Sequence, residues 1–285
     1  MSFSQDTRGT PNQMYLFDDG FVFTCRDVRS ETARFNAALL LSLDGGTFDL
    51  GAGDSQHRLS AAAVRPLLTR RLHADGHRFI SIGLSPNHVD FRPFGVLGAP
   101  GYLGLDPAPF AGWAEPLGAL HAGELPPAEA RDLSDELVRE AVAQLPVPRP
   151  LDPRVVHAIG RLDQDPQLPL EDLAGETGLS YDRMSHLFSE SMGLPLRSYT
   201  LSLKIHTAAR LVGTGMNMTD IAHAAGFSDS SHFSRVWLRA YGGTPSYFYA
   251  SDHVRLQRLL GEHPNRRDPS TAPRPDQRSG AISVA

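Results

Sequence analysis

The sequence is poor in cysteine, in long apolar runs and in secretory features. Cys25 is the only cysteine among 285 residues, so no disulfide can form within the chain. The longest apolar run, residues 37–41, is far shorter than the roughly 18 residues that a membrane-spanning helix needs. Residues 1–13 lack the basic and apolar regions of a secretory signal. Together these absences predict a cytoplasmic protein with no membrane insertion.

The sequence also has no excess of basic residues. Its 27 Lys and Arg are outnumbered by 32 Asp and Glu, which gives a net charge of −5. Within residues 151–250, too, acidic side chains slightly outnumber Lys and Arg. Most nucleic-acid-binding proteins carry a basic excess that attracts phosphate groups. If this chain binds DNA, the geometry of specific contacts must supply much of the affinity, and non-specific binding should be weak.

Short apolar segments separated by turn residues fill the region from Met14 to Phe94. The turn sequences DDG at 18–20 and DGG at 44–46 lie between segments of strand length and favour hairpins. Many short strands at this spacing predict a small β-sandwich or barrel. The expected strands cover residues 14–17, 21–24, 37–43, 47–50 and 79–84.

Helix-length segments follow from about residue 106. In ARDLSDELVREAVAQL, an apolar residue recurs at every fourth position, at Leu133, Leu137, Ala141 and Leu145, and forms one face of a helix. Such a stripe is most simply part of the core, and a dimer-forming surface is the alternative. The segment PVPRP at 146–150 cannot continue a helix and is typical of a stiff linker.

The C-terminal part contains an internal repeat. DLAGETGLSYDRMSHLFSESMG, which starts at Asp172, can be laid over DIAHAAGFSDSSHFSRVWLRAYG, which starts at Asp220, with one extra residue in the second copy. Each copy predicts a short helix, a glycine turn and a second helix with a serine N-cap, which is a helix-turn-helix. The matched turn and cap residues are Gly178 and Ser180 in the first copy and Gly226 and Ser228 in the second.

The second helix of each copy would present polar side chains near its N-terminus, where a recognition helix meets base edges. Arg235 could bond a guanine with two hydrogen bonds, and Asp182 could accept a bond from a cytosine amino group. An exposed polar residue on a helix is usually only solvated surface, so the duplicated framework is what favours DNA contact. The candidate DNA-binding residues are Asp182, Ser185, His186, Ser230, Ser231 and Arg235.

A helical segment from Leu196 to about Val212 joins the two copies. A helix of this length measures about 27 Å, close to one turn of DNA. It could therefore hold the two helix-turn-helix units on successive major-groove segments of double-stranded DNA.

These residues resemble the AraC/XylS family of bacterial transcription regulators. The similarity runs from LPLEDLAGETGLSYDRMSHLFSESMGLP through Lys204 and residues 208–211 to DIAHAAGFSDSSHFSRVW, and covers about one third of the chain. The resemblance implies that the six residues above read bases. His186 stands where the family usually has arginine, and Leu196 replaces a usual proline, so the first unit should contact DNA more weakly than the second.

The N-terminal region resembles, more loosely, the cupin-type sensor domains of many such regulators. That resemblance implies that a small-molecule effector and homodimerisation act through this region, and that RNA polymerase is a partner if the protein is an activator. Arg26, Arg29 and Arg34 could line a pocket for an anion, but basic surface is the simpler interpretation.

The sequence predicts neither a metal nor another cofactor, and no enzymatic activity. A metal-binding cupin enzyme would need a cluster of histidines on its strands, usually with a carboxylate. The histidines here are scattered and none forms an H-x-H pair: His57, His73, His77, His88 and His121. Two alternatives stay open, which are a cupin-like metal enzyme with a DNA-binding appendage and a regulator that acts only by contacts with other proteins.

The complete prediction is an α+β protein. A small cupin-like β-barrel or sandwich with a helical dimerisation segment precedes an all-α domain with two helix-turn-helix units. The expected parts are a disordered N-terminus at 1–13, a sensor and dimerisation domain at 14–145, a Pro-rich linker at 146–153, a DNA-binding domain at 154–252 and a largely disordered tail at 253–285.

Overall fold

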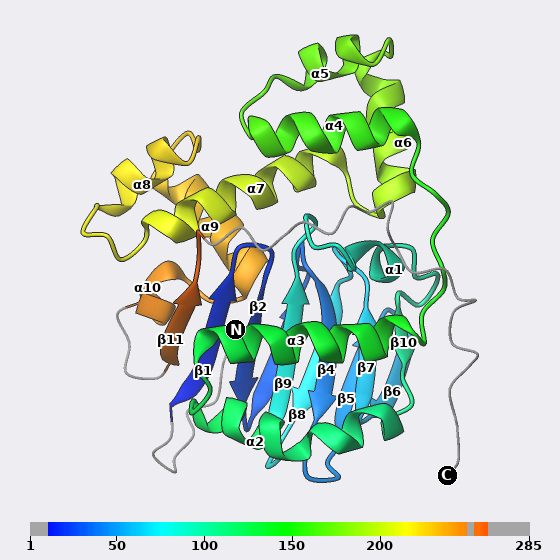
Figure 1. The fold of residues 1–285 in the computed structure, drawn as a ribbon, viewed down its shortest axis with the longest axis vertical. Coiled ribbons are helices and arrows are strands. Elements are labelled where there is room, and N and C mark those ends of the chain that lie inside the picture. The colour runs from blue at the N-terminus through cyan, green and yellow to red at the C-terminus, as the bar shows by residue number, and fades with distance from the viewer. Residues whose placement is uncertain (1–10, 250–253, 262–285) are drawn as a thin grey trace, which may run out of the picture.

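The computed structural model describes residues 11–249 and 254–261, and its N-terminal part contains two β-sheets packed face to face (Figure 1). The seven-stranded sheet has the order β10 (Tyr102–Gly104), β7 (Ala61–Val64), β4 (Ala37–Ser42), β9 (Phe79–Leu84), β2 (Gly20–Cys25), β1 (Asn12–Phe17) and β11 (Val254–Leu259). The four-stranded sheet has the order β3 (Val28–Thr32), β8 (Arg70–Ala74), β5 (Phe48–Ala52) and β6 (Ser55–Leu59). The predicted β-sandwich is confirmed, while its likeness to cupins stays a prediction.

The strands that sequence analysis found are the apolar central ones. Every residue of β2 and β9 is buried, because one face of their sheet packs on the second sheet and the other is covered by helices. β7 was missed because its sequence is Ala-Ala-Ala-Val, and alanine has little strand preference. β8 was missed because it carries several charged residues, although Arg70, Leu72 and Ala74 alternate as buried residues along it.

Two helices, α2 (Ala114–Ala122) and α3 (Pro127–Val142), cover the outer face of the seven-stranded sheet (Figure 1). The apolar stripe of α3 is buried here at Leu133, Leu137 and Ala141. The stripe therefore belongs to the core, as the sequence most simply predicted. This face of α3 is not available for contact with a second copy of the chain. A homodimer stays a prediction that has to use another surface.

The chain after residue 150 is helical. It forms α4 (Pro153–Gln164), α5 (Leu170–Glu176), α6 (Tyr181–Met192), α7 (Leu196–Leu211), α8 (Met218–Ala224), α9 (Ser230–Tyr241) and α10 (Pro245–Tyr249). With α1 (Phe91–Gly95) and the 3₁₀-helix η1 (Ala108–Trp113) in the N-terminal part, the fold class is α+β, as predicted.

The expectation of disorder at both ends is wrong where the structure describes them. Asn12 and Gln13 begin β1, and residues 254–259 form β11, which pairs in parallel with β1 from Asn12↔Val254 to Phe17↔Leu259. The polar residues that favoured disorder begin at Pro264, whereas VRLQRL before them alternates apolar and polar residues in part, as a strand does. The remaining terminal positions, 1–10 and 262–285, lie outside the described residues.

An arginine on α3 holds the hairpin turn between β1 and β2. Both guanidinium ends of Arg131 donate to the carboxylate of Asp19, one of them at 2.9 Å, and its Nε lies 3.1 Å from Asp135. The Arg131 and Asp19 side chains are each only 15 % exposed. Burial raises the pKa of Asp19, but the hydrogen bonds from Arg131 and the nearby charges, that of Arg131 included, together outweigh burial and leave that pKa below its usual value.

We predict that Arg131→Met lowers the free energy of unfolding by about 3 kcal/mol, because Asp19 is left charged and mostly buried without its partner. Urea denaturation measures the loss. Arg139→Met is the matched control on the same helix, since Arg139 pairs with Glu136 on the exposed surface, where an ion pair contributes about 1 kcal/mol or less. Equal losses in the two variants would contradict this role of Arg131.

Candidate nucleic-acid interface

The first predicted helix-turn-helix is formed by α5 and α6. α5 begins at Leu170, two residues before the predicted start, and the chain turns at Gly178, where φ is +70°. The hydroxyl of Ser180 accepts a hydrogen bond of 3.4 Å from the backbone N–H of Arg183. Gly178 and Ser180 therefore have the turn and cap roles that the sequence predicted.

The second unit, α8 and α9, differs at its cap. The turn again uses glycine, with φ +78° at Gly226, but Asp229 is the N-cap of α9 and accepts a 2.7 Å hydrogen bond from the N–H of His232. The prediction of Ser228 as the cap is wrong, since its hydroxyl donates to Asp229 at 2.9 Å. The extra residue of the second copy lies in this turn and moves the cap one position along the chain.

The buried faces of the second helices fix their orientation in each unit. On α9 the ring of Trp237 packs edge-on against Phe233 and at a tilt against Tyr241, with centroids 5.6 and 4.6 Å apart. On α6, Phe188 packs edge-on against Tyr199 of α7 at 5.3 Å. Because these faces are fully buried, the opposite faces of α6 and α9 are directed to solvent.

The predicted DNA-contact residues lie on those solvent-directed faces. Asp182 and His186 of α6 are exposed, as are Ser231 and Arg235 of α9. Ser185 and Ser230 are half-buried. No described residue is paired with the Arg235 side chain in a hydrogen bond or salt bridge, so its guanidinium is available to a ligand.

Two further arginines lie on these helices outside the predicted set, Arg183 and Arg239. Arg183 is exposed in the first turn of α6, three residues before His186, and helical spacing could have identified it. Arg239 of α9 is exposed as well, but its guanidinium lies 4.4 Å from the ring centroid of Phe35 in the N-terminal domain. Only the tertiary structure shows that Arg239 contacts the sandwich.

The two units lie at opposite ends of α7 (Figure 1), which at 16 residues is about 24 Å long. Lys204 of α7 donates a 2.9 Å hydrogen bond to the carbonyl of Gly226 in the turn of the second unit. The C-terminal end of α6 approaches α1 so closely that a Cβ on Gly193 would clash with the carbonyl oxygen of Gly95. The position of each unit is therefore set by direct contacts.

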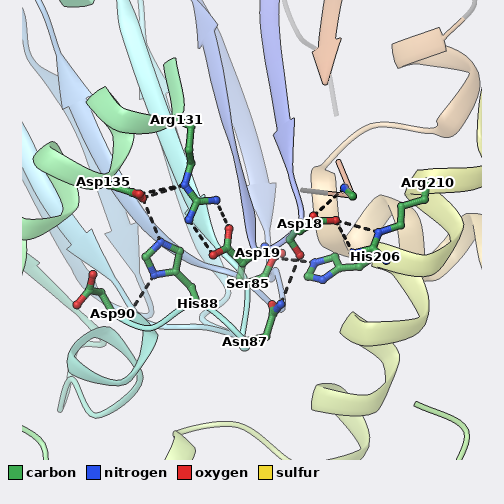
Figure 2. Close-up of polar contacts among 12 residues, drawn as sticks. Asp18, Asp19, Ser85, Asn87, His88, Asp90, Arg131, Asp135, His206 and Arg210 are labelled. Atoms are coloured by element: carbon green, nitrogen blue, oxygen red, sulfur yellow. Dashed lines mark hydrogen bonds and ion pairs between the residues drawn. The ribbon is translucent and has the colours of Figure 1, made fainter. Parts of the chain in front are cut away.

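A polar junction joins α7 to the N-terminal domain (Figure 2). Nε2 of His206 lies 2.9 Å from the hydroxyl of Ser85, and Arg210 donates to Asp18 at 2.9 and 2.7 Å. Burial lowers the pKa of His206 to about 4, although the charges of Asp19 and Asp18 oppose the shift. The junction therefore holds a neutral imidazole at neutral pH.

The described part of the chain contains no group of three or more His, Cys, Asp or Glu side chains that could hold a metal ion. Nor does any described helix have the length and apolar character needed to span a bilayer.

Comparison with known proteins agrees with this geometry. Residues 173–251 match a family model described as a helix-turn-helix domain. The transcriptional activator NphR of a Rhodococcus species is 31% identical over 104 residues, which are 36% of this chain and 30% of that protein. The arabinose operon regulatory protein of Salmonella typhimurium is 31% identical over 118 residues, 40% of this chain and 42% of that protein. The matches thus span less than half the length of these relatives.

The whole fold has a structural relative as well. Wild-type ToxT from Vibrio cholerae strain SCE256, solved with bound unsaturated fatty acid, aligns over 86% of this chain and 96% of that one, with a TM-score of 0.50 and 12% identity. This likeness concerns the fold alone.

Fold and site together define a protein with a β-sandwich domain and a double helix-turn-helix domain. The double helix-turn-helix domain, over residues 173–251, is of the type that the AraC/XylS transcription regulators carry.

We predict that the docking of α7 weakens as the pH falls below 6.5. A histidine released from the junction has a pKa near 6.5, so between pH 6.5 and 4 the released state binds more protons than the docked state. The stabilisation is complete above pH 6.5 and is lost toward pH 4. The Tm of the wild-type protein should therefore fall more between pH 7 and 5 than that of His206→Gln, which keeps a polar side chain but cannot titrate.

His186→Gln is the matched control, since His186 is an exposed histidine of the same domain. Differential scanning calorimetry at the two pH values measures the effect. An identical fall in Tm for all three proteins would refute this role of His206.

Proposed function

We propose that this protein is a sequence-specific DNA-binding transcription regulator that reads two neighbouring major-groove segments of double-stranded DNA. The observation that carries the proposal is the duplicated helix-turn-helix, with polar side chains exposed near the N-termini of α6 and α9. The similarity of this domain to the activator NphR and to the arabinose operon regulators supports it.

The exposed residues divide into base-reading and positioning groups. Arg235 is the guanine reader, and Ser230 and Ser231 donate to or accept from base edges or phosphates. In the first unit, Asp182 accepts from a cytosine amino group, and Ser185 and His186 contact a base or phosphate. Arg183 joins this set as a cation beside His186, in a unit where the family's usual arginine is absent.

The wider role follows from the two-domain arrangement. The N-terminal domain acts as the sensor of a small-molecule effector, the protein works as a homodimer, and an activating form contacts RNA polymerase. A regulator of chromosomal DNA acts in the cytoplasm. It is not an enzyme, since the similar curated proteins are named as regulators.

A metal-dependent activity of the sandwich is the less favoured alternative. Elemental analysis of the purified protein distinguishes the regulator from the metal enzyme, because a stoichiometric transition metal would support the enzyme. The third possibility is a regulator that acts only through contacts with other proteins, and the acidic balance of residues 151–250 is the one observation that favours it. Such a protein would bind no genomic DNA fragment even at low salt.

We predict that Arg235→Ala weakens binding to a mapped genomic site about 10- to 100-fold, because one two-bonded guanine contact is worth about 1–3 kcal/mol. Genome-wide mapping of bound sites supplies the fragments, and footprinting with fluorescence anisotropy measures affinity. The wild-type protein should protect two segments about one turn apart, and Arg235→Ala should lose protection mainly in one of them.

Arg58→Ala serves as the control, since Arg58 is an exposed arginine of the N-terminal domain that pairs with Asp49. Equal affinities of Arg235→Ala and Arg58→Ala for the mapped site would count against base reading by Arg235.

A further inference from the structure

Two arginines of the β-sandwich are buried, and the residues that the structure describes supply no counter-charge to them. Arg34, in the connection between β3 and β4, is 8 % exposed, and Arg70, the first residue of β8, is 3 % exposed. The interpretation of Arg34 as basic surface is therefore wrong. In the described part of the chain, no hydrogen bond or ion pair holds either guanidinium, and the Nε atom of each is buried without a partner.

The surroundings disfavour the two charges. Burial lowers the pKa of Arg34 to about 10, and burial together with the nearby charge of Arg34 lowers the pKa of Arg70 to about 9. Burial also raises the pKa of Cys25, beside Arg34, to about 12, so its thiol is neutral and cannot balance the arginines. Both arginines stay protonated at pH 7, and two unpaired buried cations are costly for a fold.

The backbone holds these two residues close to each other. The N–H of Leu67, in the loop that leads into β8, donates a 2.6 Å hydrogen bond to the carbonyl of Arg34. Leu67 has φ +58°, a left-handed conformation that is strained for a large side chain. On β8, Arg70 shares its buried face with the apolar Leu72 and Ala74.

We propose that Arg34 and Arg70 together bind the oxyanion group, a carboxylate or a phosphate, of a small effector of this protein. The inference rests on the proposed regulatory function and names the chemical class of its effector. Guanidinium groups match the planar carboxylate and the phosphate with paired hydrogen bonds. The anion supplies the charge that the described residues lack.

The segment 34–36 connects this site to the helix-turn-helix domain. Phe35 stacks under Arg239 of α9 at 4.4 Å. Asn36 donates a 2.8 Å hydrogen bond to the hydroxyl of Ser85, which lies 2.9 Å from His206 of α7. An anion that draws Arg34 toward Arg70 moves the residues that contact α7 and α9, so its binding changes the placement of the DNA-reading helices.

The test is the thermal shift of the full chain with three sodium salts: inorganic phosphate, succinate and benzoate, with chloride at matched ionic strength as the baseline. At about 100 times its Kd, at least one salt should raise the Tm of the wild-type protein by about 5 °C. A shift with phosphate but not with succinate or benzoate would indicate a phosphate group in the effector, and the reverse would indicate a carboxylate.

Arg70→Met should abolish this shift, and Arg71→Met should preserve it, because Arg71 is the exposed neighbour on the same strand. Without any salt probe, the Tm of Arg70→Met should equal or exceed that of the wild type, since an unpaired buried charge has been removed. No shift with any probe, an equal shift in Arg70→Met, or a Tm of that variant lowered by about 5 °C overturns the proposal.

Hydrogen exchange tests the connection to the helices without using DNA. The probe that binds should change amide exchange in α7 and α9 of the wild type, and Arg239→Gln should lose the change in α9 while keeping the thermal shift. Unchanged exchange in both helices overturns the coupling. Arg235→Ala should keep the thermal shift, so a failure of DNA binding is distinguishable from a failure of the anion site.

Discussion

The docking of α7 on the β-sandwich is the contact on which the positions of both helix-turn-helix units depend. α7 carries one unit at each end, and a single helix is stiff over this length. The contact of His206 with Ser85 favours one placement of the helix, since a buried polar group is costly unless it meets its partner. Arg210 adds more exposed hydrogen bonds to Asp18. Ile205 and Ala208 of α7 are buried in the apolar cluster that includes both the sandwich interior and the second unit.

The hairpin turn at residues 18–20 has a second role in this arrangement. Asp18 accepts hydrogen bonds from Arg210 of α7 and from the N–H of Gly261, just after β11, while Asp19 is held by Arg131 of α3. One turn of the sandwich thus joins a covering helix, the linker helix and the returning chain. The sequence pattern explains Asp18 and Asp19 as turn residues. In the folded chain their carboxylates also bind arginines that are distant in sequence.

The two parts of the chain share their cores. One apolar cluster runs from the helix-covered face of the sheet into α4, α5 and α6, and the other runs from the sandwich interior into α8, α9 and α10. Each helix-turn-helix unit therefore packs against a different side of the N-terminal domain. A change between the two sheets, near Arg34 and Phe35, reaches the second unit through direct contact rather than through the proline-rich linker.

The sequence by itself determined the class of fold, the two helix-turn-helix units and the exposed polar positions of their second helices, because hydrophobic period, glycine turns and an internal repeat are local signals. It could not determine the Asp229 cap, the alanine strand β7 or the addition of β11 to β1, because a one-residue offset and strand pairing are settled by neighbours in space. Only the tertiary structure decided that Arg239 contacts Phe35 and that Arg34 and Arg70 are buried together. Whether a charged side chain is buried or paired depends on the residues from elsewhere in the chain that surround it, and the local sequence does not specify those residues.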